Sequence, residues 1–119
     1  LLKAMQEAEA YNGPSLIIAY APCINHGINM RFSQEAMKKA AAAGHWPLYR
    51  YNPQNKAEGK PALTWESKEP TIPFKDYILA ERRYTMLKGA NPDHAEELYT
   101  MAEEDARKRF AMIRKMAGE

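Results

Sequence analysis

The sequence predicts an α/β fold in which a partial layer of parallel sheet is followed by a mainly helical C-terminal segment. Residues 15–21 read Ser-Leu-Ile-Ile-Ala-Tyr-Ala, a continuous apolar run that is typical of a strand buried on both faces of a parallel sheet. Helix and strand patterns alternate up to about residue 52, which indicates an α/β layer. Beyond that point helical periodicity dominates. We therefore expect two parts, an α/β portion over residues 1–52 and a mainly helical extension over residues 53–119.

Composition and charge limit the kind of protein this is. The chain has 119 residues, the size of one small domain, and its net charge is only +2. It has no basic stripe with interleaved aromatics for nucleic acid, no apolar run near the ~20 residues of a membrane helix, and no secretion signal. A single cysteine fits a reducing compartment. We expect a cytoplasmic protein that binds neither nucleic acid nor membrane, and, because Leu1 already lies in a helical pattern, a piece of a larger chain.

Helix ends and turn residues divide the first half of the chain. Gly13 and Pro14 end the first helix, because glycine adopts the left-handed conformation and proline cannot continue a helix. Ser33 is a good N-cap for a second helix, which Gly44 closes. Pro47 stands at the start of a second strand, where its missing N–H does least harm. The expected elements are a helix over 1–11, strands over 15–21 and 46–51, and a helix over 34–43.

The second half is predicted to be mainly helical. Residues 62–67 can form a short edge strand, and apolar side chains recur at helical spacing over 74–87. Asn91-Pro92-Asp93 opens a last helix over 92–117 with an N-cap, a first-position proline and an early acid. Three pairs of acid and base lie four residues apart on it: Glu103–Arg107, Glu104–Lys108 and Asp105–Arg109.

Cys23 and His26 are the first candidates for chemistry, as a C-x-x-H in the loop after the buried strand. A structural zinc site needs four ligands, and His45 and His94 stand at no recognisable spacing. A Cys–His nucleophile pair would need a third group to orient the histidine, and the sequence shows none. The plain structural alternative is that Cys23 is a small apolar filler at a strand end. The residues alone leave these interpretations open.

Two further features have a functional and a structural interpretation. The basic end of the last helix could bind an acidic partner or a phosphate, but a solvated face opposite an apolar stripe explains it as well. An aromatic cluster could stack on a ligand, but packing between the sheet and the later segment is favoured. The basic residues are Arg107, Lys108, Arg109, Arg114 and Lys115, and the aromatic residues are Trp46, Tyr49, Tyr51 and Trp65.

Two stretches of sequence together resemble a known family. Residues 13–27, Gly-Pro-Ser-Leu-Ile-Ile-Ala-Tyr-Ala-Pro-Cys-Ile-Asn-His-Gly, and residues 45–53, His-Trp-Pro-Leu-Tyr-Arg-Tyr-Asn-Pro, resemble segments near the C-terminal end of the pyruvate:ferredoxin (flavodoxin) oxidoreductases. The spacing between them and the helical tail from Tyr77 to Tyr84 match as well. The resemblance covers nearly the whole chain.

The resemblance implies an oxidoreductase that oxidatively decarboxylates pyruvate with coenzyme A to acetyl-CoA. In this family thiamine diphosphate and Mg²⁺ carry the carbon chemistry, and 4Fe–4S clusters pass electrons to ferredoxin or flavodoxin. Residues 1–52 would then be the last part of the thiamine diphosphate-binding domain. The resemblance also implies that the intact protein is a homodimer and that this chain works with the remainder of the same polypeptide.

Cys23 is the one site residue that the resemblance transfers, as a ligand of the 4Fe–4S cluster nearest the thiamine. Asn25 and His26 would shape its loop or donate hydrogen bonds near the cluster. The chain has no Gly-Asp-Gly metal–diphosphate motif, no Gly-rich phosphate loop and no second cysteine. We therefore expect the chain alone to be inactive and to bind neither cluster nor thiamine diphosphate.

A stand-alone interaction or scaffold domain is the alternative function. In that case the buried strand and the long last helix would serve only to bind a partner chain. The coding context distinguishes the two hypotheses. An upstream frame with Gly-Asp-Gly and C-x-x-C in the same polypeptide supports the oxidoreductase, and a start codon just before Leu1 supports the scaffold.

Overall fold

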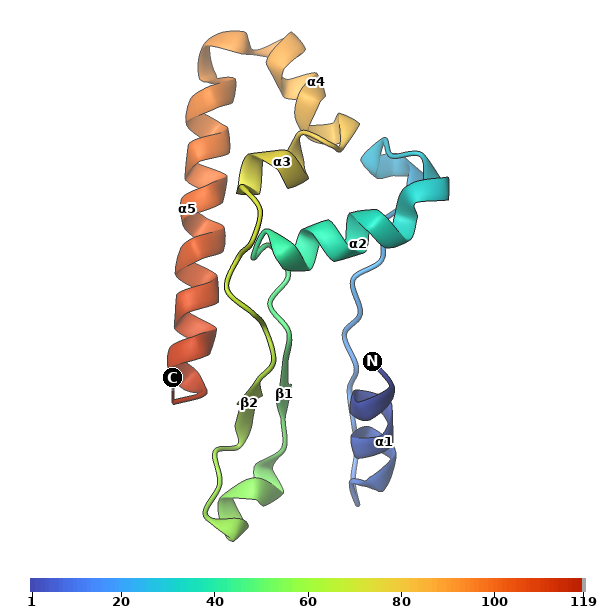
Figure 1. Ribbon diagram of the computed structural model, residues 1–119, viewed down its shortest axis with the longest axis vertical. Helices are drawn as coiled ribbons and strands as arrows, with labels where there is room; N and C mark the ends of the chain where they lie inside the picture. Colours follow the sequence, from blue (N-terminus) through green and yellow to red (C-terminus); the bar gives the residue numbers. More distant parts are fainter. Residues whose placement is uncertain (119) are drawn as a thin grey trace.

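The computed structural model describes residues 1–118 as a mainly helical molecule with one small sheet (Figure 1). It measures 53 × 30 × 23 Å along its principal axes. The long C-terminal helix follows one side, and on the other the extended segment after α1 rises to the turn that starts at residue 24 (Figure 1). The helices are α1 (Leu2–Ala10), α2 (Ser33–Ala42), α3 (Phe74–Ile78), α4 (Arg82–Ala90) and α5 (Pro92–Met116), with short 3₁₀ turns η1 (Ile24–His26), η2 (Met30–Phe32) and η3 (Pro53–Glu58). The strands are β1 (Tyr49–Tyr51) and β2 (Leu63–Trp65).

Three of the four predicted helices are confirmed to within a few residues, as α1, α2 and α5. The prediction of one helix over 74–87 was wrong, because the structure divides it into α3 and α4. Glu81 leaves the helical region at the break, with φ −109° and ψ 126°. This turn lets its carboxylate point into the protein, where it is 1% exposed. The break therefore exchanges helical hydrogen bonds for a buried polar contact.

The expected cap of α2 differs in a small way. Ser33 is the first helical residue, and Phe32 takes the cap position without a side-chain hydrogen bond. The turn η2 leads directly into α2, so the capping contact lies one turn earlier, where Asn29 accepts a hydrogen bond from the Arg31 N–H at 3.0 Å. The chain is therefore already in a helical turn, η2, before α2 begins.

The parallel layer expected over residues 1–52 is not present among residues 1–118, and the fold class is shown only in its helical part. Residues 15–21 are extended, as a strand would be, but pair with no other strand that the structure describes. Leu16 is 84% exposed and Ile18 is 69% exposed. A strand needs a neighbour for its backbone groups and a layer for each apolar face, and the described residues supply neither.

The one sheet is an antiparallel pair built from the other two predicted strands. β1 pairs with β2, and the register places Tyr49 opposite Trp65, Arg50 opposite Thr64 and Tyr51 opposite Leu63. These strands lie inside the predicted ranges 46–51 and 62–67. The border expected after residue 52 falls in the connection between them. Among residues 1–118, no helix is both long and apolar enough to cross a membrane.

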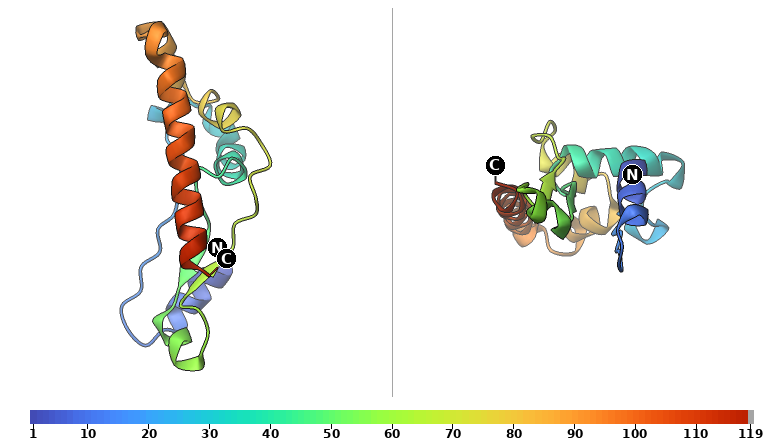
Figure 2. Two further views of the ribbon diagram at one scale, coloured as in Figure 1. Left: turned by 90° about the vertical axis from the view of Figure 1, so that its left-hand side faces the viewer. Right: turned by 90° about the horizontal axis from the view of Figure 1, so that it is seen from below.

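The hydrophobic core lies where α2, α3 and α5 meet (Figures 1 and 2). Ala40 of α2 and Ala95 of α5 are completely buried, and such small side chains allow helices to pack closely. Tyr77 and Ile78 of α3 and Tyr99 of α5 fill the space between them. Tyr99 donates a hydrogen bond to the Tyr84 carbonyl oxygen at 2.6 Å, which joins α5 to α4. This core supports the loop that contains Cys23.

Arg50 is the main attachment of α1, and its replacement is expected to release that helix. α1 buries no residue, but Glu7 accepts a hydrogen bond from Arg50, whose second guanidinium nitrogen lies 3.0 Å from Glu66. A nine-residue helix is marginal in water without such support. In Arg50→Ala we expect amide hydrogen exchange in α1 to rise at least about tenfold. Lys60→Ala, which removes an exposed pair with Glu58, is the control. Unchanged protection of α1 would contradict this role.

Candidate functional site

Cys23 lies exposed in the loop between the extended segment and η1. Its carbonyl oxygen accepts a hydrogen bond from the His26 N–H at 2.9 Å, which closes the turn. Pro22 before it is buried. Within residues 1–118 the thiol has no hydrogen-bond partner, so the Cys23–His26 pair that would activate a nucleophile is not formed. Among residues 1–118 Cys23 is exposed, so no described residue packs it as a filler at the strand end.

Gly27 fixes this loop against the start of α4. It has φ +74°, a left-handed conformation in which glycine pays no steric penalty. A Cβ atom added at Gly27 would lie only 2.2 Å from the Cβ of Arg82. The backbone of the loop therefore approaches α4 more closely than any side chain would allow.

A buried polar cluster lies beneath the loop, centred on Glu81. Its Oε1 accepts a hydrogen bond from the Tyr20 hydroxyl at 3.2 Å and faces His26 Nδ1 at 3.8 Å. Its Oε2 accepts a hydrogen bond from Arg83 Nε at 2.5 Å. An ionised carboxylate can be buried when it is paired and hydrogen-bonded in this way. This Glu81 cluster consists of Tyr20, His26, Tyr77, Glu81 and Arg83.

The two tyrosines form a hydrogen-bonded chain that ends on Glu81. The Tyr20 and Tyr77 hydroxyls are 2.8 Å apart. Because Tyr20 has one hydroxyl proton and donates it to Glu81, Tyr77 is the donor to Tyr20. Burial raises the pKa of both phenols, and the nearby Glu81 charge raises the pKa further in each case. Both tyrosines therefore remain neutral hydrogen-bond donors at ordinary pH.

His45 packs beside this cluster. Its ring lies 4.7 Å from the ring of Tyr77 and 5.9 Å from that of Phe74, measured between centroids. Burial and the positive charges of Arg109 and Arg83 lower the pKa of His45 below its usual value. Neutral imidazole suits a position among aromatic rings. This histidine supports the core beneath the loop.

Nothing in the described chain could hold a metal ion by itself. Among residues 1–118, no group of three or more His, Cys, Asp or Glu side chains is placed for metal binding. His94 lies in α5 and pairs with Glu97 at 3.6 Å. Cys23 is an exposed thiol that belongs to no such group among the described residues.

The aromatic candidates mainly serve packing. Trp46 lies 5.5 Å from Tyr20 and Trp65 packs edge-on against Phe110 of α5 at 4.8 Å, measured between ring centroids, while Tyr49 and Tyr51 are exposed. The four aromatics therefore do not form one stacking site. The packing of Trp65 on α5 agrees with the structural interpretation.

The basic end of α5 is partly engaged with the rest of the molecule. The predicted pairs Glu103–Arg107 and Glu104–Lys108 are present, at 3.4 Å and 3.6 Å. Arg109 instead donates to the His45 carbonyl oxygen at 3.0 Å. Arg109 therefore joins α5 to His45, just after α2, whereas Arg107 and Lys108 pair along α5 and stay exposed.

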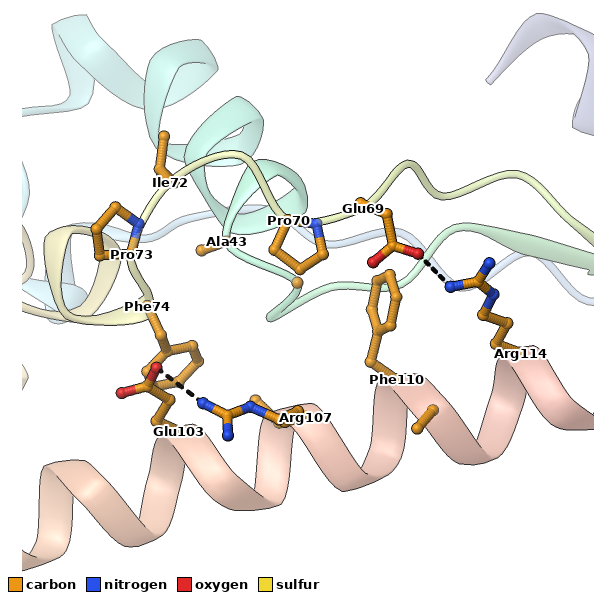
Figure 3. Close-up of a pocket in the computed structure, with 13 residues that line it drawn as sticks. Ala43, Glu69, Pro70, Ile72, Pro73, Phe74, Glu103, Arg107, Phe110 and Arg114 are labelled. Carbon is orange, nitrogen blue, oxygen red and sulfur yellow. Dashed lines mark hydrogen bonds and ion pairs between the residues drawn. The ribbon is translucent and has the colours of Figure 1, made fainter. Parts of the chain in front are cut away.

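A groove of about 400 Å³ separates α5 from the end of α2 and the segment 69–74 (Figure 3). Its floor is apolar, with Phe74 and Phe110 among its walls. Two ion pairs lie at its sides, Glu103 with Arg107 and Glu69 with Arg114 (Figure 3). No residue of the Cys23 loop or of the Glu81 cluster lines this groove, so it is separate from the candidate site.

Sequence reasoning missed the Glu81 cluster. Tyr20 was assigned to a buried strand and Tyr77 to a helix face, but nothing connected them to Glu81. Tyr20 and Glu81 are 61 positions apart, so no local pattern can reveal their contact. The available signal was an acidic residue followed by Arg82 and Arg83 inside an otherwise regular helical pattern.

Comparison with known proteins shows what the chain is similar to. No protein-family model matches the chain. A pyruvate:ferredoxin oxidoreductase of Moorella thermoacetica is 56% identical over 117 residues, and a pyruvate-flavodoxin oxidoreductase of Klebsiella pneumoniae is 52% identical over 120. A probable pyruvate-flavodoxin oxidoreductase of Escherichia coli is 43% identical over 118 residues.

These matches cover 98–99% of this chain but only 10% of each relative, so the chain spans about a tenth of their length. Identity at this level over the whole chain includes both stretches on which the sequence resemblance rests. Across nearly its whole length, this chain is therefore similar to a C-terminal fragment of the pyruvate:ferredoxin and pyruvate-flavodoxin oxidoreductases, which confirms the resemblance found in its sequence.

Proposed function

We propose that this chain is the C-terminal part of an oxidoreductase that oxidatively decarboxylates pyruvate with coenzyme A to acetyl-CoA and passes electrons to ferredoxin or flavodoxin. The observation that carries the proposal is the 56% identity, over 98% of the chain, to a relative with that name. The intact enzyme would act in the cytoplasm, as a homodimer, on pyruvate and coenzyme A.

We also propose that the missing remainder of the polypeptide covers a large part of this chain. The chain exposes 8724 Å², whereas a compact monomer of 13.6 kDa exposes about 6,600 Å². The extended segment 15–21 carries exposed Leu16, Ile17 and Ile18. In the intact enzyme it would join the parallel sheet of the thiamine diphosphate-binding domain, of which residues 1–52 are the end. Residues 53–119 would form the helical extension.

Cys23 is proposed to supply one thiolate to the 4Fe–4S cluster nearest the thiamine diphosphate. Thiolates are the normal ligands of such clusters, and an exposed thiol without a hydrogen-bond partner is free to bind one. The other three ligands must come from outside this chain, since it contains one cysteine. When bound, the cluster supplies one-electron transfer. What this chain contributes is the ligand and the loop that presents it.

The experiment compares the intact enzyme with its Cys23→Ala and Glu96→Gln variants after anaerobic purification. We expect Cys23→Ala to lose about four iron atoms per chain and the electron paramagnetic resonance signal of one reduced cluster. Glu96→Gln, a change at an exposed ion pair with Lys75 away from the Cys23 loop, is the control and keeps its iron. Full iron and sulfide content in Cys23→Ala would disprove the ligand role.

The isolated chain provides the complementary measurement. After anaerobic reconstitution we expect it to bind neither a stoichiometric 4Fe–4S cluster nor thiamine diphosphate, and to show no pyruvate oxidation. One thiolate cannot hold four irons. A full cluster per isolated chain would disprove the assignment of the other ligands to the rest of the polypeptide.

A further inference from the structure

The two flanks of the Cys23 loop converge on one carboxylate. Tyr20, three residues before Cys23, donates a hydrogen bond to Glu81 Oε1 at 3.2 Å. His26, three residues after Cys23, presents Nδ1 to the same oxygen at 3.8 Å. Glu81 is 1% exposed and lies at the start of α4, on the element against which Gly27 packs.

We infer that Glu81 is a positioning residue that clamps both flanks of the Cys23 loop and thereby sets where the Cys23 thiolate is presented. Burying a carboxylate is costly, and the chain breaks a predicted helix to place Glu81 here. Arg83 holds Oε2 at 2.5 Å, which leaves Oε1 for the loop. Only the expected effect on the cluster rests on the proposed function. The clamp itself concerns residues of this chain.

The two flanks are held differently: Tyr20 is hydrogen-bonded to Glu81, and His26 faces it at 3.8 Å without a hydrogen bond. The Tyr20 arm is reinforced by Tyr77, whose hydroxyl lies 2.8 Å from that of Tyr20. The His26 arm is a buried ring nitrogen without a hydrogen-bond partner among the described residues, and Glu81 is the acid nearest to it. The loop between these arms is otherwise exposed, so removing either arm should free it.

The test uses the intact enzyme with Glu81→Gln, Tyr20→Phe and Glu96→Gln. Glutamine keeps the size of Glu81 but loses the charge that strengthens its hydrogen bonds, and phenylalanine removes only the Tyr20 hydroxyl. Glu96→Gln is the matched control, the same chemical change at an exposed pair with Lys75. Hydrogen exchange of amides 24–28 is measured by mass spectrometry, and the midpoint potentials of the clusters by redox titration.

We expect amide exchange in residues 24–28 to rise at least about tenfold in Glu81→Gln and Tyr20→Phe and to stay unchanged in Glu96→Gln. Tyr20→Phe leaves the Glu81 charge in place, so a shift of one cluster's midpoint potential in that variant reports the position of the loop. Wild-type exchange in both clamp variants, acceleration in Glu81→Gln alone, or an unmoved potential in Tyr20→Phe would each overturn the inference. If Glu81→Gln also loses protection in α5, its fold has failed and Tyr20→Phe decides.

The failure of this inference and that of the proposed function are distinguishable. If Cys23→Ala keeps its iron, the ligand role is wrong, whatever the exchange data show. If Cys23→Ala loses iron while the loop of Tyr20→Phe exchanges as in wild type, the ligand role holds and the clamp is wrong.

Discussion

Replacing Tyr77 with alanine is expected to lower the free energy of unfolding by about 3–5 kcal/mol, the range measured for removal of a large buried aromatic. Tyr77 of α3 is 1% exposed and packs in the core with Ala40 of α2 and Tyr20 of the extended segment. Its ring contacts those of His45 and Phe74, and its hydroxyl donates to Tyr20. The change therefore opens a cavity in the core and leaves the Tyr20 hydroxyl without its donor.

Two matched variants separate these contributions. Tyr77→Phe keeps the ring and loses the hydrogen bond, so we expect a loss of about 0.5–1.5 kcal/mol. Tyr49→Ala removes the same atoms from an exposed strand position, 46% accessible, and should cost about 0.5 kcal/mol or less. Urea denaturation followed by the fluorescence of Trp46 and Trp65 measures all three. Equal losses for Tyr77→Ala and Tyr49→Ala would show that Tyr77 is not central to the core.

Gly27→Ala is expected to have the second-largest effect, a loss of about 2–5 kcal/mol. A left-handed conformation costs a residue with a Cβ about 1–2 kcal/mol, and overpacking typically costs about 1–3 kcal/mol more. The overpacking here is severe, because the new Cβ would meet Arg82 Cβ at 2.2 Å and the Arg82 backbone at 3.1–3.2 Å. The loop must lift from α4, which also weakens the contacts of Tyr20 and His26 with Glu81.

Gly59→Ala is the control for this prediction. Gly59 has nearly the same backbone conformation, φ +72°, but nothing lies within 4 Å of an added Cβ. It should therefore show only the conformational cost, about 1–2 kcal/mol. The difference between the two variants, measured by urea denaturation, isolates the close approach of the loop to α4. If Gly27→Ala and Gly59→Ala lose the same stability, that approach does not matter for folding.

Local patterns predicted most of the elements because their signals are local. The proline and early acid at residues 92–93 located the start of α5. Gly13-Pro14 marked the end of α1 to within a few residues, but Gly13 does not adopt the predicted left-handed conformation, and the helix ends on an extended Tyr11. The helix over 74–87 was predicted as continuous because its apolar spacing does not break at Glu81. That break depends on Tyr20 and Arg83, and the contact with Tyr20 is invisible to a pattern that extends over a few residues.

The candidate site was predicted only in part, for the same reason. Cys23 was found because it is the one thiol and stands in a recognisable stretch. The residue that supports its loop was not found, because Glu81 lies 58 positions after Cys23 in the sequence. The four aromatic residues that the sequence grouped together do not cluster in the structure. Trp65 packs against Phe110, and Trp46 packs against Tyr20.

The sequence by itself determined three of the four predicted helices, the two short strands, the place of Cys23 in a loop and the resemblance to the oxidoreductases. Each of these features depends on residues close together in the sequence, through apolar spacing, turn residues or a continuous motif. Only the tertiary structure decided that segment 15–21 lies unpaired and that Glu81 joins Tyr20 to His26 beneath the Cys23 loop. Such contacts depend on which distant surfaces bury one another, and burial is a property of the folded chain as a whole.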